Sequence, residues 1–146
     1  LAALTRSFLI AIISIVVFSF IVEIPIYNIL YIFIFGFLSA FILGSLGFIT
    51  GLWAEKFDHT ATVTNFIITP LSFLSGVFYS IDKLPKFFQI ISHVNPFFYM
   101  IDGFRYGFLG KSDGSISIGI VYLIILSFVM WFIAFYLYKK GYKIKS

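Results

Sequence analysis

Asp102 and Arg105 are the charged residues whose spacing says most about this sequence. They stand three positions apart in a segment rich in aromatic residues. On a helix, residues three apart lie on one face and can form an ion pair. Pairing would lower the cost of placing either charge near lipid. We therefore predict an ion pair here and no catalytic role.

Other residues that could do chemistry lack the partners they would need. His59 and His93 are predicted on opposite sides of a membrane, and neither has carboxylates at metal-ligand spacing. The segment Gly110-Lys111-Ser112 looks like the end of a phosphate-binding loop, but position 105 is arginine where the first glycine is required. The absence of cysteine excludes thiolate catalysis. We predict no catalytic, cofactor-binding or metal-binding residue.

Composition indicates the solvent in which the chain folds. Hydrophobic residues make up 61% of the 146 residues and charged residues only 11%, less than half the usual share of charge in a globular domain. A soluble domain of this size could not bury so much apolar surface. The net charge of +4 is too small to indicate a nucleic-acid partner. The chain begins with Leu1, and we expect a fragment whose natural start is missing.

Long apolar runs predict an all-α membrane protein embedded in a lipid bilayer. A helix that crosses the hydrocarbon core needs about 20 mostly apolar residues. Transmembrane strands would instead alternate in character over about ten residues. We expect a single transmembrane domain over residues 1–146, with four spans at about residues 8–22, 29–53, 62–81 and 116–138.

The distribution of lysine and arginine predicts the orientation. One face of the membrane would carry six of them and a net charge of +4, and the other would carry four and a net charge of zero. Since cytoplasmic loops carry the excess of positive residues, the first face and the C-terminus should be cytoplasmic. The first face holds Arg6, Lys56, Lys139, Lys140, Lys143 and Lys145, and the second holds Lys83, Lys86, Arg105 and Lys111.

The outer segment between the last two spans contains two apolar pieces too short to cross a membrane. Residues 84–94 have the pattern of an amphipathic helix, and Pro85 suits a first helical turn. Asn95-Pro96 then breaks this helix and begins a second one over residues 96–109, which stops at Gly110. The pair is either re-entrant, covering a cavity, or interfacial, sealing the bundle, and periodicity favours neither.

Small residues and one proline mark where helices would approach or bend. Gly36, Ala40 and Gly44 recur at four-residue steps, followed by Gly47 and Gly51. Such residues let helix backbones approach closely in lipid. We favour packing within the bundle over a subunit interface.

In the third span, Pro70 frees the carbonyl of Phe66 and should bend the helix, in a stretch that also contains Gly76. Broken, polar-flecked helices of this kind often line transport pathways. Serine and threonine side chains can equally satisfy their own backbone.

The order of residues from Thr69 to Gly107 closely resembles the permease subunit of ABC-2 type exporters. The resemblance is carried by Leu-Ser-Gly-Val-Phe-Tyr at 74–79, Leu84-Pro85, Asn95-Pro96 and Asp-Gly-Phe-Arg-Tyr at 102–106. It implies a six-span protein of the bacterial inner membrane, of which this chain contains the last four spans. The first two spans, and the main coupling segment before the third, would be missing.

The resemblance also implies partners. These are a second copy of the permease and a separate ABC ATP-binding subunit, which holds ATP and Mg²⁺, so this chain needs no cofactor. The inner loop would contact the ATPase, and the two outer helices would re-enter near the exit of the pathway. The coupling loop comprises Glu55, Lys56, Phe57 and Asp58. The spacing of Asp102 and Arg105 beside Asn95-Pro96, and not the resemblance, predicts that the two charges form a latch at an outer gate. The gate comprises Asn95, Pro96, Tyr99, Asp102 and Arg105.

The expected function is export by alternating access of a hydrophobic or amphiphilic substrate such as a drug, a lipid or a lipid-linked glycan. The alternative is a membrane subunit for assembly or anchoring that transports nothing. A channel is a third possibility, but no charged or carbonyl-rich filter is apparent.

Overall fold

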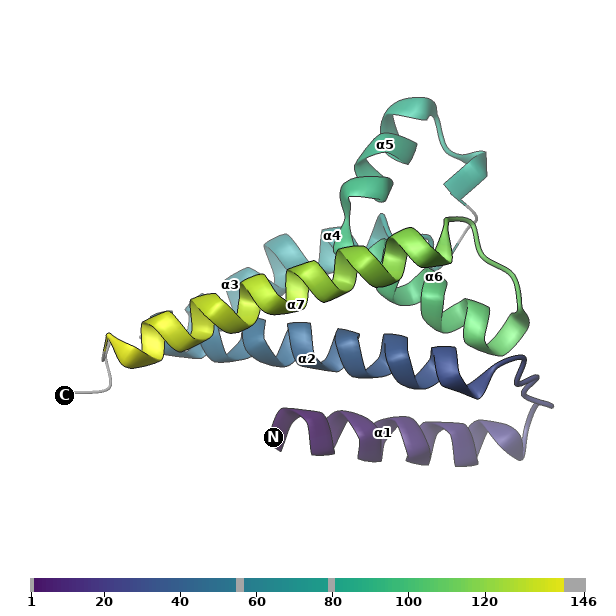
Figure 1. Cartoon of the computed structure of the whole chain (residues 1–146), viewed down its shortest axis with the longest axis horizontal. Coiled ribbons are helices and arrows are strands. Elements are labelled where there is room, and N and C mark those ends of the chain that lie inside the picture. The colour runs from purple at the N-terminus through teal and green to yellow at the C-terminus, as the bar shows by residue number, and fades with distance from the viewer. Residues whose placement is uncertain (1, 55–56, 79–80, 141–146) are drawn as a thin grey trace.

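The computed structural model describes residues 2–54, 57–78 and 81–140, and every regular element in that part of the chain is helical (Figure 1). This confirms the all-α part of the predicted fold class for the described residues. In chain order the elements are α1 (Ala2–Ser19), α2 (Ile29–Trp53), α3 (Phe57–Val63), the π-helix η1 (Thr64–Ile68), α4 (Thr69–Phe73), the 3-10 turn η2 (Ile81–Lys83), α5 (Lys86–Val94), α6 (Pro96–Leu109) and α7 (Ile116–Lys139).

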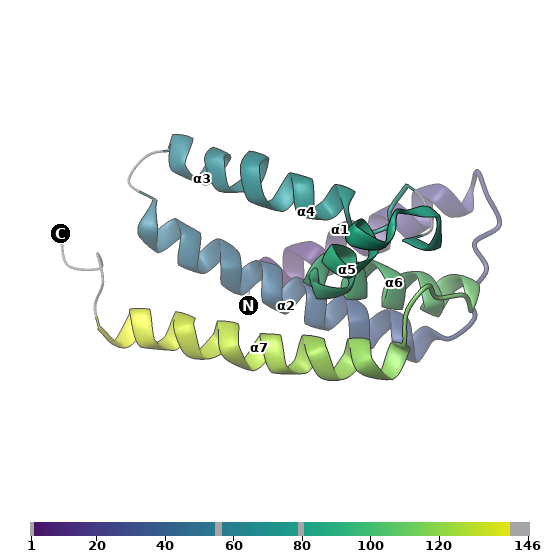
Figure 2. The same ribbon diagram turned by 90° about the horizontal axis from the view of Figure 1, so that it is seen from above.

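The long helices lie lengthwise and reverse direction along the chain (Figures 1 and 2). The C-terminal end of α2, the start of α3 and the C-terminal end of α7 lie at one end of the molecule. Helices α5 and α6, together with the start of α2, lie toward the opposite end. The start of α3 thus lies at the end of the molecule opposite α5 and α6. The orientation of the chain in a membrane stays a prediction.

Two of the described helices, α2 and α7, are long and apolar enough to cross a membrane, and Leu4–Ser19 in α1 is a shorter apolar helix. The bounds of α2 coincide with the predicted 29–53, and α7 extends one residue beyond the predicted end at 138. Helix α1 begins at Ala2, within the extension toward Leu1 that the sequence allows. It ends before the predicted residue 22 because the chain turns after Ser19, where the N–H of Ile21 bonds to the carbonyl of Phe18 at 3.0 Å. The count of four spans stays a prediction.

The third predicted span differs most from the structure. Its helical run extends from Phe57 to Phe73, where residues 62–81 were expected. It ends early because Leu74 leaves helical geometry and Gly76 takes a left-handed conformation with φ of 77°, which favours glycine. Pro70 is preceded by the π-helical turn η1, in which the Thr69 N–H bonds to the Thr64 carbonyl. A distortion at this proline was expected.

The helix ends around α6 follow their local sequence signals. The Asn95 side chain accepts a hydrogen bond from the Phe97 N–H at 3.0 Å, and Pro96 occupies the first helical position. Gly110, with φ of 67°, ends the helix. The bounds 96–109 are therefore those predicted. Helix α5 begins at Lys86 and not at residue 84, because Pro85 precedes the first turn in an extended conformation.

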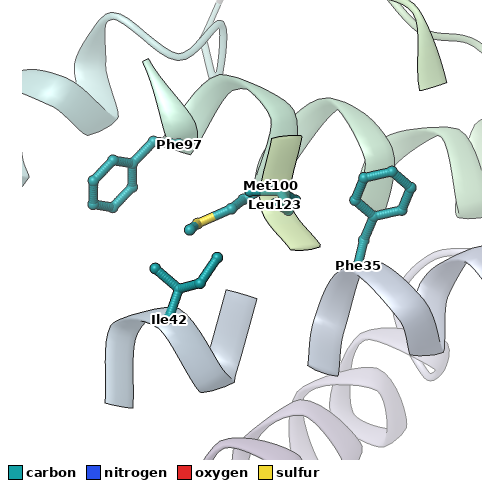
Figure 3. Packing of buried hydrophobic residues seen from close by; sticks show 5 residues of the cluster. All are labelled: Phe35, Ile42, Phe97, Met100 and Leu123. Carbon is teal, nitrogen blue, oxygen red and sulfur yellow. The ribbon is translucent and has the colours of Figure 1, made fainter. Parts of the chain in front are cut away.

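The buried core lies where α2, α6 and α7 meet (Figure 3). Six residues of α6 are buried, so this helix is packed between α2 and α7. The core residues are Phe35 and Ile42 of α2, Phe97 and Met100 of α6, and Leu123 of α7.

Helix α5 turns an apolar face outward. Phe87, Ile90 and Val94 are about two-thirds exposed, whereas Ser92 is fully buried. An apolar face turned outward suits lipid or another chain. Whether α5 and α6 are re-entrant or interfacial therefore stays open.

Candidate functional site

An ionic network joins α6 to the loop that leads into α7. The Arg105 guanidinium lies 2.7 Å from Asp102 Oδ1 and 2.9 Å from Asp113 Oδ2. Asp102 is only 3% exposed and Arg105 27%. The predicted neighbours at positions 102 and 105 are thus in contact. Asp113 is a third member that spacing along the helix did not reveal.

Asp102 also holds the backbone of this loop. Its carboxylate accepts hydrogen bonds from the N–H groups of Asp113 at 2.8 Å and Gly114 at 3.0 Å. Asp113 in turn accepts a bond from the Ile81 N–H at 3.3 Å. Burial opposes the charged form of Arg105, but hydrogen bonds and attraction to the two carboxylates raise its pKa above the usual value. The side chain therefore stays charged, and the network fixes α6, the loop and η2 together.

The corner between α5 and α6 is bonded to the end of the third helical run. The Asn95 side-chain amide donates to the Leu71 carbonyl at 2.6 Å, and the Ser92 hydroxyl donates to the Leu74 carbonyl at 2.8 Å. Asn95 is 3% exposed. On the other side, the Tyr122 hydroxyl of α7 donates to the Val94 carbonyl at 2.8 Å. These bonds connect the outer corner to both neighbouring helices.

Asn95→Asp is expected to destabilise the protein by about 1–3 kcal/mol, although aspartate caps a helix as well as asparagine does. The carboxylate still accepts from the Phe97 N–H, but it cannot donate to the Leu71 carbonyl. A buried carboxylate then faces the carbonyl oxygen of the half-buried Leu71. Thermal unfolding of the purified full-length protein in detergent measures the loss.

Asn28→Asp is the matched control for this change. Asn28 caps α2 by accepting from the Leu30 N–H at 3.0 Å, and an aspartate keeps that bond. It should leave the melting temperature nearly unchanged. Equal losses at Asn28 and Asn95 would contradict the role given to the Leu71 carbonyl.

Glycines let α6 approach its neighbours closely. A Cβ at Gly107 would lie 2.9 Å from the Ile32 backbone nitrogen and 3.3 Å from the Asn28 carbonyl oxygen. A Cβ at Gly103 would overlap the buried Phe35 ring. The sequence singled out Gly103 only within the Asp-Gly-Phe-Arg-Tyr motif, and not as a residue of close packing.

Tyr99, which was predicted in the outer gate, packs on Tyr122 of α7, with the two ring centroids 5.0 Å apart.

The glycines predicted to pack on α2 show different surroundings. A Cβ at Gly36 would meet the Phe104 ring at 3.5 Å, which is ordinary contact. At Gly47 and Gly51, apart from the backbone of α2 itself and the neighbouring residues in the chain, no described atom lies within 4 Å of such a Cβ. Gly44 borders a depression beside Arg6. Packing of the last three against another helix stays a prediction.

The predicted coupling loop falls largely outside the described part of the chain. Glu55 and Lys56 lie outside the described residues, and of Phe57 and Asp58 only the backbone is described, at the start of α3. His59 contacts the Trp53 ring, and His93 contacts the Phe98 ring. Within the described residues, no group of three acidic or histidine side chains could hold a metal ion.

Comparison with known protein families identifies the family to which this chain belongs. Residues 1–109, from α1 through the end of α6, match the family model described as ABC-2 type transporter. The chain belongs to the ABC-2 type transporter family. Its apolar helices and this family together make it a membrane protein of the ABC-2 permease type.

Curated relatives agree with this membership. The chain is 39% identical over 109 residues to the inner membrane transport permease YadH of Escherichia coli (strain K12). The aligned region covers 75% of this chain and 43% of YadH. It is 29% identical over 97 residues to Nodulation protein J of Sinorhizobium fredii (strain NBRC 101917 / NGR234), covering 66% of this chain and 37% of the relative. The chain thus spans less than half the length of these relatives. No solved structure is significantly similar to it.

Proposed function

We propose that this ABC-2 chain belongs to the membrane subunit of an ATP-driven exporter, which works as a dimer with a separate ABC ATP-binding subunit. The observation that carries the proposal is the family match over residues 1–109, supported by the similarity to an inner membrane transport permease. Alternating access would move the helices when the ATPase closes on ATP. In the orientation that the lysine and arginine distribution predicts, the C-terminus faces the cytoplasm. Helices α5 and α6 then lie on the outer side of the inner membrane.

Copurification tests the partnership directly. The full-length protein, tagged and expressed with the ABC ATP-binding subunit encoded beside it, should retain that subunit through affinity and size-exclusion steps at a defined ratio. Failure to retain it, with the permease itself folded and monodisperse, would favour the alternative of an assembly or anchoring subunit.

A hydrophobic or amphiphilic substrate suits the surfaces that the helices present. A pocket of about 400 Å³ between α2 and α7 is lined by Phe37, Phe41, Phe128 and Trp131. Ser127 also lines it, but its hydroxyl oxygen is buried, so the accessible lining is almost entirely apolar. A ligand with a large apolar body fits such a lining. Drugs, lipids and lipid-linked glycans all belong to this class.

The loop at 55–58 is the proposed contact with the ATPase. Phe57→Ala should lose substrate-stimulated ATP hydrolysis because the aromatic side chain would no longer pack in a groove of the partner, and Asp58→Arg should lose it because a charge pair is reversed. The measurement is ATPase activity of the reconstituted full complex with and without substrate. Lys111→Ala, at the opposite end of the molecule, is the control. Normal stimulation in both loop variants would remove this loop from the coupling path.

A further inference from the structure

A narrow apolar cavity lies between α1, α2 and α6, and we call it the α1 crevice. Its volume is about 280 Å³. Its walls include Ala11, Ile15, Phe33 and Phe104, and its exposed lining is almost entirely apolar. An apolar cavity of about 150 Å³ in a protein interior already binds benzene. The α1 crevice therefore has room for a larger apolar group.

The lining of the α1 crevice fits an alkyl chain. A chain of methylene groups gains free energy from each CH₂ that it buries and needs no hydrogen-bonding partner in the cavity. Leu9, Ile13 and Phe18 on α1 are more than half exposed, as expected for a helix that lies against lipid.

The two ends of the α1 crevice differ in charge. Ser7 and Ala40 line both the cavity and a more polar depression beside Arg6. Arg6 has no ion pair among the described residues. At the other end, Ile15 and Phe108 lead to a depression beside Arg105 and Glu23. Arg105 is already neutralised by two carboxylates, so within the described part of the chain only the Arg6 end offers a cation without a carboxylate partner.

We infer that the α1 crevice binds one acyl chain of an anionic phospholipid whose phosphate lies against Arg6. The headgroup then sits in the cytoplasmic leaflet, which rests on the orientation proposed above. Arg6 lies beside Ala40, Gly44 and Phe48 of α2, and a long basic side chain that extends from within the bilayer toward its surface attracts anionic lipid. The bound lipid fills the gap that α1 leaves against α2 and α6, away from the pocket that Ser127 lines.

Two variants of the full-length permease separate the headgroup from the acyl chain. Arg6→Gln removes the charge without filling the cavity, and Ala11→Phe fills the cavity without changing the charge. Their controls are Lys111→Gln, an exposed cation at the other end, and Ile10→Phe, on the lipid-facing side of α1. Native mass spectrometry of the protein in mild detergent, titrated with phosphatidylglycerol or phosphatidylcholine, gives the affinity of each.

The wild type should bind one phosphatidylglycerol per chain in preference to phosphatidylcholine. Arg6→Gln should weaken phosphatidylglycerol about fivefold, the effect of one basic residue at a lipid surface, and leave phosphatidylcholine unchanged. Ala11→Phe should weaken both lipids, and neither control should alter binding.

Wild-type affinity in Arg6→Gln and Ala11→Phe would overturn the inference, and so would equal losses in the controls, which would mean a general lipid annulus. If Ala11→Phe aggregates, Arg6→Gln still decides the question. Lipid binding is measured without the ATPase, so failure of copurification would affect the proposed function and not this site.

Discussion

Asp102→Ala is expected to destabilise the intact protein by about 3 kcal/mol and to abolish transport. The change leaves Arg105 with one carboxylate and removes the acceptor for the N–H groups of Asp113 and Gly114. Losing the buried partner of a charge, together with two backbone acceptor bonds, is among the most costly single changes in a folded protein. Thermal unfolding in detergent and transport in reconstituted vesicles measure the two effects.

Exchanging the two charges distinguishes this network from a simple ion pair. For a simple pair, Asp102→Arg combined with Arg105→Asp would restore function. We expect no rescue, because an arginine at position 102 cannot accept hydrogen bonds from the loop backbone. Glu23→Ala, which removes an exposed acid outside the network, is the control and should change stability by less than about 0.5 kcal/mol. Full rescue by the exchange would show that the backbone bonds of Asp102 are dispensable.

Local signals account for most of what could be predicted about this region. Asn95, Pro96 and Gly110 fix the bounds of α6 because each acts on the backbone beside it. The contact between Asp102 and Arg105 follows from one turn of helix. Asp113 could not be found in this way, because its position depends on the path of the loop after Gly110 and not on any helical period.

Hydropathy was less informative where several apolar segments are contiguous. The third span was placed at 62–81 because residues 77 to 81 remain largely apolar, yet the helix ends at Phe73. A positive φ at Gly76 and the bond from the Ser75 hydroxyl to the Ser72 carbonyl mark this end. Glycine is common in membrane helices, so its presence alone did not indicate a stop.

The glycines show the same limitation. Repeats of small residues on α2 suggested close packing, but the closest approaches made by glycine lie on α6, at Gly103 and Gly107. Those two are also four residues apart. The four-residue step indicates a face of small residues, but it does not tell which face meets a neighbour, because that depends on the tertiary arrangement.

Gly107→Ala is expected to destabilise the protein by about 3 kcal/mol, because the new methyl group would meet backbone that cannot rotate away. The Ile32 nitrogen would lie 2.9 Å from it. The N–H groups of Tyr27 and Asn28 bond to the Gly107 carbonyl at 3.1 Å and 2.8 Å, so separating α6 from the start of α2 would weaken these bonds as well. Thermal unfolding of the full-length variant measures the effect.

Gly47→Ala provides the opposite expectation within the same fold. Apart from the backbone of α2 and the adjacent residues, no described atom lies within 4 Å of its Cβ position, and alanine favours a helix interior over glycine by about 0.5–1 kcal/mol. Gly47→Ala should therefore leave the melting temperature unchanged or raise it, while Gly107→Ala lowers it. Stability equal to the wild type in Gly107→Ala would show that α6 does not pack this closely on α2. A loss in Gly47→Ala would instead indicate that this face of α2 packs against a segment outside the described residues, because no described side chain lies within 4 Å of that position.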